Sequence, residues 1–384
     1  MTTTPRSPRR DARPHPGDEK SFRTETTLAG YARTAVTLKT RMDAYCHSTG
    51  GRKYLTTFAE AFHDNAIPDQ PPTAEYIDAI HRLAGSAWRI GEPYVLAPAM
   101  TAIVAAAADA LDLAGETLND EVAPGDFGVL FLPDPIYARN PRGQLTGIAA
   151  ITWARLSAPG GSAWAIAGWS ALADPDDPET ARLNATLRRN PKVRRYLGPY
   201  LLADLDYLPV DRPVQARETA PVDEADLDWE PAPDGRYVID TTGCPTSVCT
   251  AIIYAFWRIQ AQPLATVAPA PLDRSAARRA ARASVVHDTR VVMLRRTSPL
   301  AEPADGEAKW HYRVRFMVRL SVREFWGSAT TGDSSLRGVA DPSRTTLSGG
   351  CLRQFSSRDH IRAAGAAVGR RSDVDGVGSR RAAA

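Results

Sequence analysis

The period of the apolar residues changes at Gly125, and this change constrains the fold more than any other feature of the sequence. Before Gly125, apolar residues such as Tyr31, Ala35 and Leu38 recur at steps of three and four, which is typical of amphipathic helices. After Gly125, short apolar runs are bounded by Gly, Pro or Asp, which is typical of strands. The chain therefore predicts an α+β fold in which N-terminal helices pack with a mainly antiparallel sheet.

Residues 26–120 are expected to form the helical region. The stripe that includes Tyr31 is followed by a second one at Tyr54 and Phe58, after the Gly50-Gly51 break. Thr73 precedes a third stripe, and residues 97–113 predict a further helix that Gly115 ends.

Residues 121–210 are expected to hold a β-meander plus helices. Gly160 and Gly161 accept positive φ and favour a tight turn between the second and third apolar runs. Asp177 and Pro178 are typical of a helix start. The three apolar runs lie at 127–132, 148–156 and 164–172, and the expected helices at 179–189 and 193–205.

Charge reverses in residues 204–234, where ten acidic residues accompany two arginines and five prolines. This composition predicts a solvated acidic linker or long surface loop. Residues 235–326 are then expected to form the C-terminal, helix-and-strand part of the core. Its predicted elements are a strand at 237–240, an apolar helix at 248–260 buried on two sides, a helix at 272–286, and strands at 290–296 and from 311 onward.

Both ends of the chain have compositions that favour disorder. Residues 1–25 are polar and nearly free of large apolar groups, so a disordered leader is expected. From 320 to 384, Arg, Ser, Gly and Ala supply 38 of 65 residues. We hypothesise a reading-frame change near residues 320–327, and we expect residues 327–384 to form a disordered tail.

The overall composition excludes several classes of protein. Hydrophobic residues make up 43% of the chain and charged residues 24%, which is typical of a globular protein. A net charge of +3 is too small for a chain that is basic throughout, so any basic surface must be local. No apolar stretch follows the N-terminal arginines, and Pro98, Asp109 and Asp112 interrupt the best membrane candidate, residues 95–113. A cytoplasmic protein without a membrane partner is therefore expected.

Cys244 is the residue that most suggests an enzyme. The loop 240–249 places it before a helix, whose N-terminus favours a thiolate. Four residues separate Cys244 from Cys249, whereas thioredoxin-type chemistry needs two, and no signature of a cysteine hydrolase surrounds it. A structural or capping role of this loop, with Ser247 or Thr246 as the cap, is the favoured alternative.

Metal and cofactor motifs are absent from the sequence. The histidines are isolated, with no HExxH pattern, and the four cysteines show no paired CxxC spacing. Neither a GxxxxGK[ST] loop nor a GxGxxG motif after a strand is present. The sequence therefore predicts no metal and no cofactor.

Arginines on one helix and one strand form the favoured candidate site. Asp273 can cap a helix on which arginines recur every four residues, and the strand from 311 alternates apolar residues with arginines. Packed together, these segments would bind phosphates through a compact basic surface. The chain has only five lysines among 47 basic residues, so a solvated arginine-rich face remains the alternative. The predicted nucleic-acid-binding residues are Arg274, Arg278, Arg282, Arg313, Arg315 and Arg319.

Several segments resemble an uncharacterised group of actinobacterial proteins that also occurs with phages and mobile elements. They include LFLPDPIYARNPRGQLTGIAAITWARL at 130–156, LDRSAARRAAR at 272–282 and WHYRVRFMVR at 310–319. The group has no established activity, so the resemblance implies the setting of a mobile element and no catalytic residue.

These observations favour a non-enzymatic interaction protein with a basic surface, such as a nucleic-acid-binding accessory protein of a mobile element. One alternative is a cysteine-dependent enzyme that uses Cys244. Another is a structural partner in a protein complex, which predicts an exposed aromatic patch at Trp153, Trp164 or Trp169. The same tryptophans are expected to pack on one face of the sheet.

Overall fold

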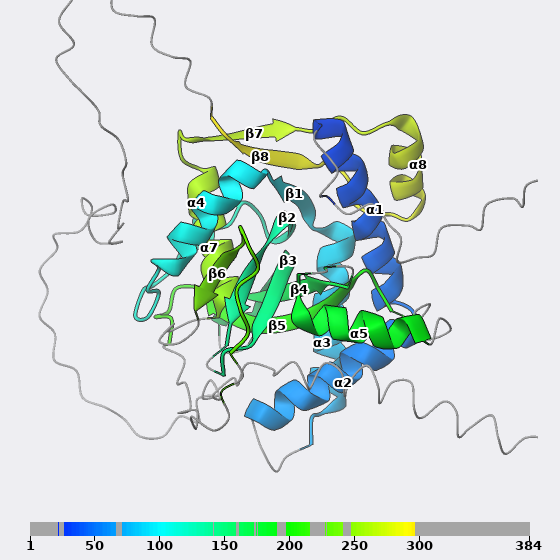
Figure 1. Cartoon of the computed structure of the whole chain (residues 1–384), viewed down its shortest axis with the longest axis vertical. Coiled ribbons are helices and arrows are strands. Elements are labelled where there is room, and N and C mark those ends of the chain that lie inside the picture. The colour runs from blue at the N-terminus through cyan, green and yellow to red at the C-terminus, as the bar shows by residue number, and fades with distance from the viewer. Residues whose placement is uncertain are drawn as a thin grey trace, which may run out of the picture.

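An eight-stranded sheet runs through the centre of the computed structural model, with helices on both of its faces (Figure 1). The described part of the chain contains seven α-helices, and the expected α+β fold with a mainly antiparallel sheet is confirmed. The structure describes residues 22, 27–66, 71–140, 142–158, 161–172, 174, 176–189, 197–215, 227, 229–240 and 247–295.

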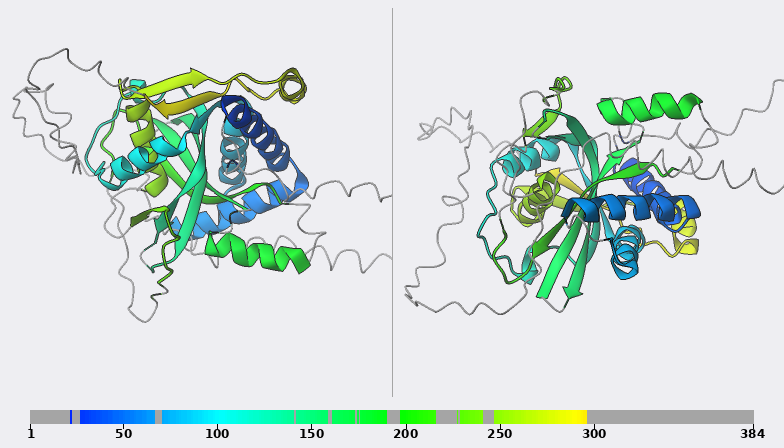
Figure 2. Two further views of the ribbon diagram at one scale, coloured as in Figure 1. Left: turned by 45° about the horizontal axis from the view of Figure 1, so that its top comes forward. Right: turned by 90° about the horizontal axis from the view of Figure 1, so that it is seen from below.

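Three N-terminal helices cover one face of the sheet, as Figure 2 shows in blue. Thr27 and Thr73 cap the first and third of them, accepting from the backbone N–H groups of Gly30 and Tyr76. The predicted stripe on the first helix is buried in the core, including Met42. These helices are α1 (Leu28–Cys46), α2 (Thr49–Ala66) and α3 (Ala74–Ile90).

The opposite face is covered by α4 (Pro98–Asp109) and α7 (Val248–Gln260). Ser247 caps α7, since its hydroxyl accepts from the N–H of Thr250. In α7, nine of the first ten residues are buried, so the predicted burial on two sides is confirmed. No helix in the described part of the chain is long and apolar enough to cross a membrane.

The strand order is β5-β4-β3-β2-β1-β8-β7, and β6 pairs with β2 beyond this path. Strand β1 is parallel to both of its neighbours, β2 and β8, whereas β2 to β5 form an antiparallel meander and β7 is antiparallel to β8. The strands are β1 (Glu92–Leu96), β2 (Phe127–Arg139), β3 (Leu145–Ala158), β4 (Gly161–Ala171), β5 (Tyr200–Pro209), β6 (Tyr237–Asp240), β7 (Ala265–Pro269) and β8 (Arg290–Leu294).

The predicted meander is present, but its first strand is longer than the apolar run. Pro133 does not end β2, because the register with β3 shifts between Phe131 and Ile136. Such an irregularity tolerates a residue that cannot donate to the ladder. The strand then continues to Arg139 and pairs there with β6.

The helix expected at residues 193–205 is wrong, because Tyr200–Pro209 forms β5. A register shift between Gly168 and Trp169 leaves one extra residue on β5. Leu202 and Leu205 therefore share a core despite a helical spacing of three.

The three tryptophans do not share a face, and none is exposed. Trp153 and Trp164 pack with Trp257 on the α7 side, whereas Trp169 packs against Trp88 of α3 on the other. Each of the three predicted patch residues is at most 1% exposed. The exposed aromatic patch expected for a structural partner is therefore wrong for these residues.

The acidic segment is not a solvated linker throughout. Asp204 and Asp206 lie in β5, and Asp204 is buried. Glu230 is buried as well, where it accepts from the N–H of Leu145 at 2.7 Å and pairs with Arg182 at 2.9 Å. These carboxylates attach the segment to the sheet. Residues 216–226 and 228 lie outside the described residues.

The helix predicted after Asp177 is present as α5 (Pro178–Arg189). The Asp177 carboxylate accepts from the N–H of Thr180 at 2.9 Å and from that of Gly147 at 2.8 Å. It therefore caps α5 and also fixes the helix to β3.

Candidate nucleic-acid interface

The predicted arginine helix is present as α8 (Arg274–Arg282), which packs against α1 at the β7–β8 end of the sheet (Figure 1). Asp273 caps it as expected, because its carboxylate accepts from the N–H of Ala276 at 2.8 Å. The helix is shorter than the expected 272–286, since Ser284 has a φ of 56° and ends the helical turn.

The arginines lie on the side of α8 that faces away from the protein. Ala276 and Ala280 are buried, whereas the predicted arginines are exposed. At about 100° per residue, the centre of the arginine stripe lies about 180° from the centre of the buried pair. All three guanidinium groups, those of Arg274, Arg278 and Arg282, therefore face solvent.

No ion pair neutralises this stripe among the residues that the structure describes. The one carboxylate at the start of the helix, Asp273, lies 3.5 Å from Arg33 of α1. Arg279 is exposed next to the stripe and donates to the hydroxyl of Ser275 at 3.3 Å. Four arginines within nine residues thus form a local excess of positive charge.

Hydrogen bonds from α1 and α3 hold the segment after α8 in place. The N–H of Val286 donates to the carbonyl oxygen of Arg89 at 2.9 Å. The ammonium of Lys39 donates to the same oxygen at 3.0 Å and to the carbonyl oxygen of Val286 at 2.7 Å. Because Val285 is also buried, the helix is presented on a fixed support.

Lys39 itself is fully buried. Burial lowers its pKa from 10.5 to about 7, against the opposing effect of the nearby Asp43 carboxylate. Asp43 pairs with the guanidinium of Arg89 at 3.0 Å. Sequence reasoning missed this lysine, although the signal was present: Lys39 lies between Leu38 and Met42 on the buried side of α1.

The other basic residues expected near α8 have different surroundings. Arg290 of β8 pairs with Glu92 at 2.6 Å and donates to the hydroxyl of Tyr94 at 2.7 Å. It is therefore not available as part of the stripe. Arg295 is exposed at the end of β8, and Arg296 lies outside the described residues.

The strand half of the predicted site belongs to the C-terminal part of the chain, after the last described residue, Arg295. Arg313, Arg315 and Arg319 lie outside the described residues, as does the strand expected from residue 311 onward. The structure thus positions one of the two arginine groups.

Cys244 also lies outside the described residues, but both ends of its loop are described. At the start of α7, the hydroxyl of Ser247 donates to the Asp204 carboxylate, and that of Thr250 donates to Asp206 at 2.8 Å. Two carboxylates thus occupy the positive end of the helix dipole. Their negative charge disfavours a thiolate nearby.

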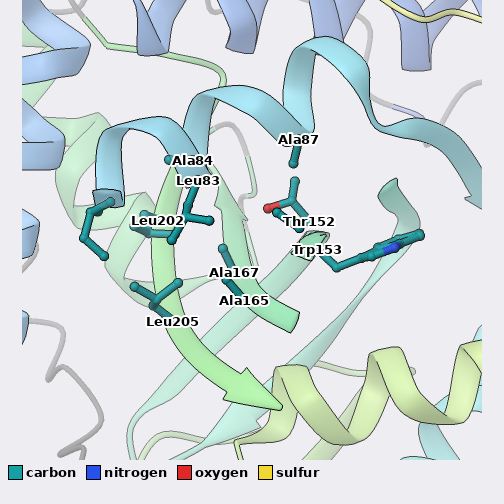
Figure 3. A pocket seen from close by; sticks show the side chains of 11 residues that line it. Leu83, Ala84, Ala87, Thr152, Trp153, Ala165, Ala167, Leu202 and Leu205 are labelled. Carbon is teal, nitrogen blue, oxygen red and sulfur yellow. The ribbon is translucent and has the colours of Figure 1, made fainter. Parts of the chain in front are cut away.

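A small apolar pocket lies between α3 and the sheet (Figure 3). Ala84 and Ala87 of α3 face Ala165 and Ala167 of β4 there, with Leu205 at one end. The cavity volume is about 10 Å³, which is room for no more than one water molecule. No lining side chain is titratable, so the pocket provides no chemistry. Elsewhere in the described ranges, no group of three or more His, Cys, Asp or Glu residues could hold a metal ion.

No match is found in comparisons of the chain with models of protein families, with curated proteins or with solved structures.

Proposed function

We propose that the protein is a non-enzymatic, nucleic-acid-binding accessory protein whose contact surface is centred on the arginine stripe of α8. The observation that carries this proposal is the stripe itself: three exposed guanidinium groups, Arg274, Arg278 and Arg282, opposite a buried pair of alanines. Arginine is well suited to phosphate, because its planar fork can donate two parallel hydrogen bonds.

The spacing of the stripe supports phosphate contacts. Residues four apart on a helix are separated by about 6 Å along its axis, so the stripe extends over about 12 Å. A helix fixed to the core loses little conformational freedom when it binds. The anchoring of α8 by Lys39 and Val286 therefore supports a site that is formed before the ligand arrives.

The setting of a mobile element and a cytoplasmic location belong to the same proposal. The resemblance of several segments to an actinobacterial group found with phages and mobile elements supports the former. The latter is supported by Cys46, whose buried thiol is free.

The test is the binding of a short fluorescein-labelled DNA duplex, followed by anisotropy over a range of salt concentrations. We expect binding to weaken steeply with salt, and the triple variant R274A/R278A/R282A to lose at least about tenfold in affinity at low salt. A matched control removes three exposed arginines of α2, α3 and the β2–β3 turn: R52A/R82A/R142A. Equal affinities of the two triple variants would remove the basis of the proposal.

A further inference from the structure

Strand β7 forms one end of the sheet, and no described strand pairs with its outer edge. Within the pair, the carbonyl oxygen of Leu264 accepts from the N–H of Arg295 at 2.8 Å, and the N–H of Ala270 donates to Thr289 at 2.9 Å. Because the direction of these groups alternates along a strand, the N–H and C=O groups of Val267 point away from β8. The carbonyl of Ala265 does so too, whereas the N–H of Ala265 donates to the carbonyl oxygen of Gln262 at 3.0 Å. The edge is therefore open to another strand.

The open edge also has an apolar side. Val267 is opposite Val292, which belongs to the core under α4 and α7, so both lie on that face of the sheet. Leu294 lies on the same face, two residues along β8. Val267 is 38% exposed and Leu294 44%, although both lie next to that core.

We propose that residues 311–323 add to this edge as a further strand next to β7. Their even-numbered positions from Tyr312 to Val322 are all apolar, which suits one buried face. Position 295, where the described chain stops, lies next to the start of β7, since Arg295 donates to Leu264. The intervening residues, 296–310, can span up to about 50 Å, enough to reach either end of β7.

The addition predicts on which face the arginines lie. If Phe316 and its even-numbered neighbours cover Val267, the odd-numbered residues face the opposite side of the sheet. That side carries α1 and, packed against it, α8. Arg313, Arg315 and Arg319 would then lie on the same side as the α8 stripe and extend its basic surface. Only this consequence rests on the proposed function.

The experiment is limited trypsin digestion of the full chain, with fragments identified by mass spectrometry. Cleavage after Arg313, Arg315 and Arg319 is expected to be at least about tenfold slower than after Arg353 and Arg362. Equal rates would overturn the proposal. Protection of the segment that increases with protein concentration would overturn it too, because a second copy would then occupy the edge.

Two variants assign the protection to β7. V267P removes an N–H that points away from β8, so it should leave the β7–β8 pair intact and expose the three sites. F316D places a charge on the apolar face of the added strand and should likewise expose the three trypsin sites. This variant replaces V267P in the test if V267P does not fold. Protection that survives both variants would contradict the pairing with β7.

DNA binding separates this inference from the proposed function. If R313A/R315A/R319A binds DNA as the wild type does while the α8 triple variant does not, the strand lies elsewhere and the proposed function stands. If neither triple variant changes binding but V267P still exposes the segment, the strand addition stands and the proposed function fails.

Discussion

The ammonium of Lys39 donates to the carbonyl oxygen of Val286 at 2.7 Å, and this contact joins α1 to the segment after α8. The same group donates to Arg89 at the end of α3, so one buried side chain holds three segments that are distant in sequence. The candidate interface is thus attached to the core through a group that titrates.

Lys39→Met is expected to remove a pH dependence of stability. The folded-state pKa, about 7, is below the unfolded value of 10.5, so between these values the unfolded chain binds more protons. Stability of the wild type therefore rises with pH in this range, by at most about 1.4 kcal/mol per pH unit, relative to the variant. Urea unfolding at several pH values from 7 to 10 measures the difference.

Lys53→Met is the control for the loss of a lysine, because Lys53 lies on α2 and is only half-buried. It should follow the wild-type profile. Parallel profiles of the wild type and Lys39→Met would show that Lys39 is charged in the folded protein across this range. Loss of the charge does not by itself break the contacts, because a neutral Lys39 amine still has two N–H donors for the carbonyl oxygens of Arg89 and Val286.

Removal of the α8 arginines is expected to change the salt dependence of DNA binding as well as its strength. If each of the three contacts one phosphate, the slope of log affinity against log salt falls in magnitude by about 2.7 for R274A/R278A/R282A. The slope is measured by anisotropy with several unrelated duplexes, among which affinity should vary little.

Single substitutions at Arg278 distinguish charge from fork geometry. Arg278→Lys keeps a positive charge and is expected to keep most of the salt slope, whereas Arg278→Ala lowers its magnitude by about 0.9. A slope that is the same in all three proteins would place the phosphate contacts outside α8.

The helices of the first hundred residues could be predicted because each has one buried side. Tyr31 and Leu38 recur at the period of a helix, and both are buried as that period requires. The error at residues 193–205 has a physical cause. Strand β5 has core residues on both faces and an extra residue in its ladder, so Leu202 and Leu205 imitate a helix.

The prediction that the three tryptophans share one face of the sheet was wrong, and the residue spacing along one strand already contradicts it. Trp164 and Trp169 are five residues apart on one strand, and an odd spacing places them on opposite faces. In the candidate site, the cap and the stripe of α8 follow from local sequence. The hydrogen bond that holds the segment after α8 in place could not be predicted from the sequence, because Lys39 and Val286 are 247 residues apart and no local pattern pairs them.

Gly128→Ala is expected to destabilise the fold, because a Cβ at this position would overlap the ring of Trp153. That ring is buried and packs against Trp257 and Phe256, so it has no room to move. A loss of about 1–3 kcal/mol is expected in urea unfolding. Gly125→Ala is the matched control, since nothing lies within 4 Å of a Cβ there, and its change should stay within about 0.5 kcal/mol.

Cys244 is expected to react as an ordinary thiol. Ser247 is at most about 11 Å away along the chain, and the carboxylates of Asp204 and Asp206 surround that residue. Their charge should keep the pKa of Cys244 from falling below its ordinary value, because a nearby negative charge disfavours the thiolate. Alkylation rates of the Cys244 peptide, measured by mass spectrometry across pH, give this pKa.

The same measurement on the urea-unfolded chain gives the reference pKa of the Cys244 thiol. The variant D204N/D206N should lower the pKa of Cys244 in the folded protein, because it removes the two negative charges. Rapid alkylation of the folded wild type at pH 6 would instead favour the cysteine-dependent enzyme.

The position of β8 has a consequence for synthesis of the protein. Strand β1 pairs with β8 through Tyr94 and Arg290, and β8 contributes Val291 to one core and Val292 to the other. Neither core closes before the ribosome has released residues 290–294. Contacts of such long sequence separation make folding slow. During translation, the α1–α3 helices and the meander are therefore made before β8, the last of the described strands, and their apolar surface stays exposed to chaperones until β8 emerges.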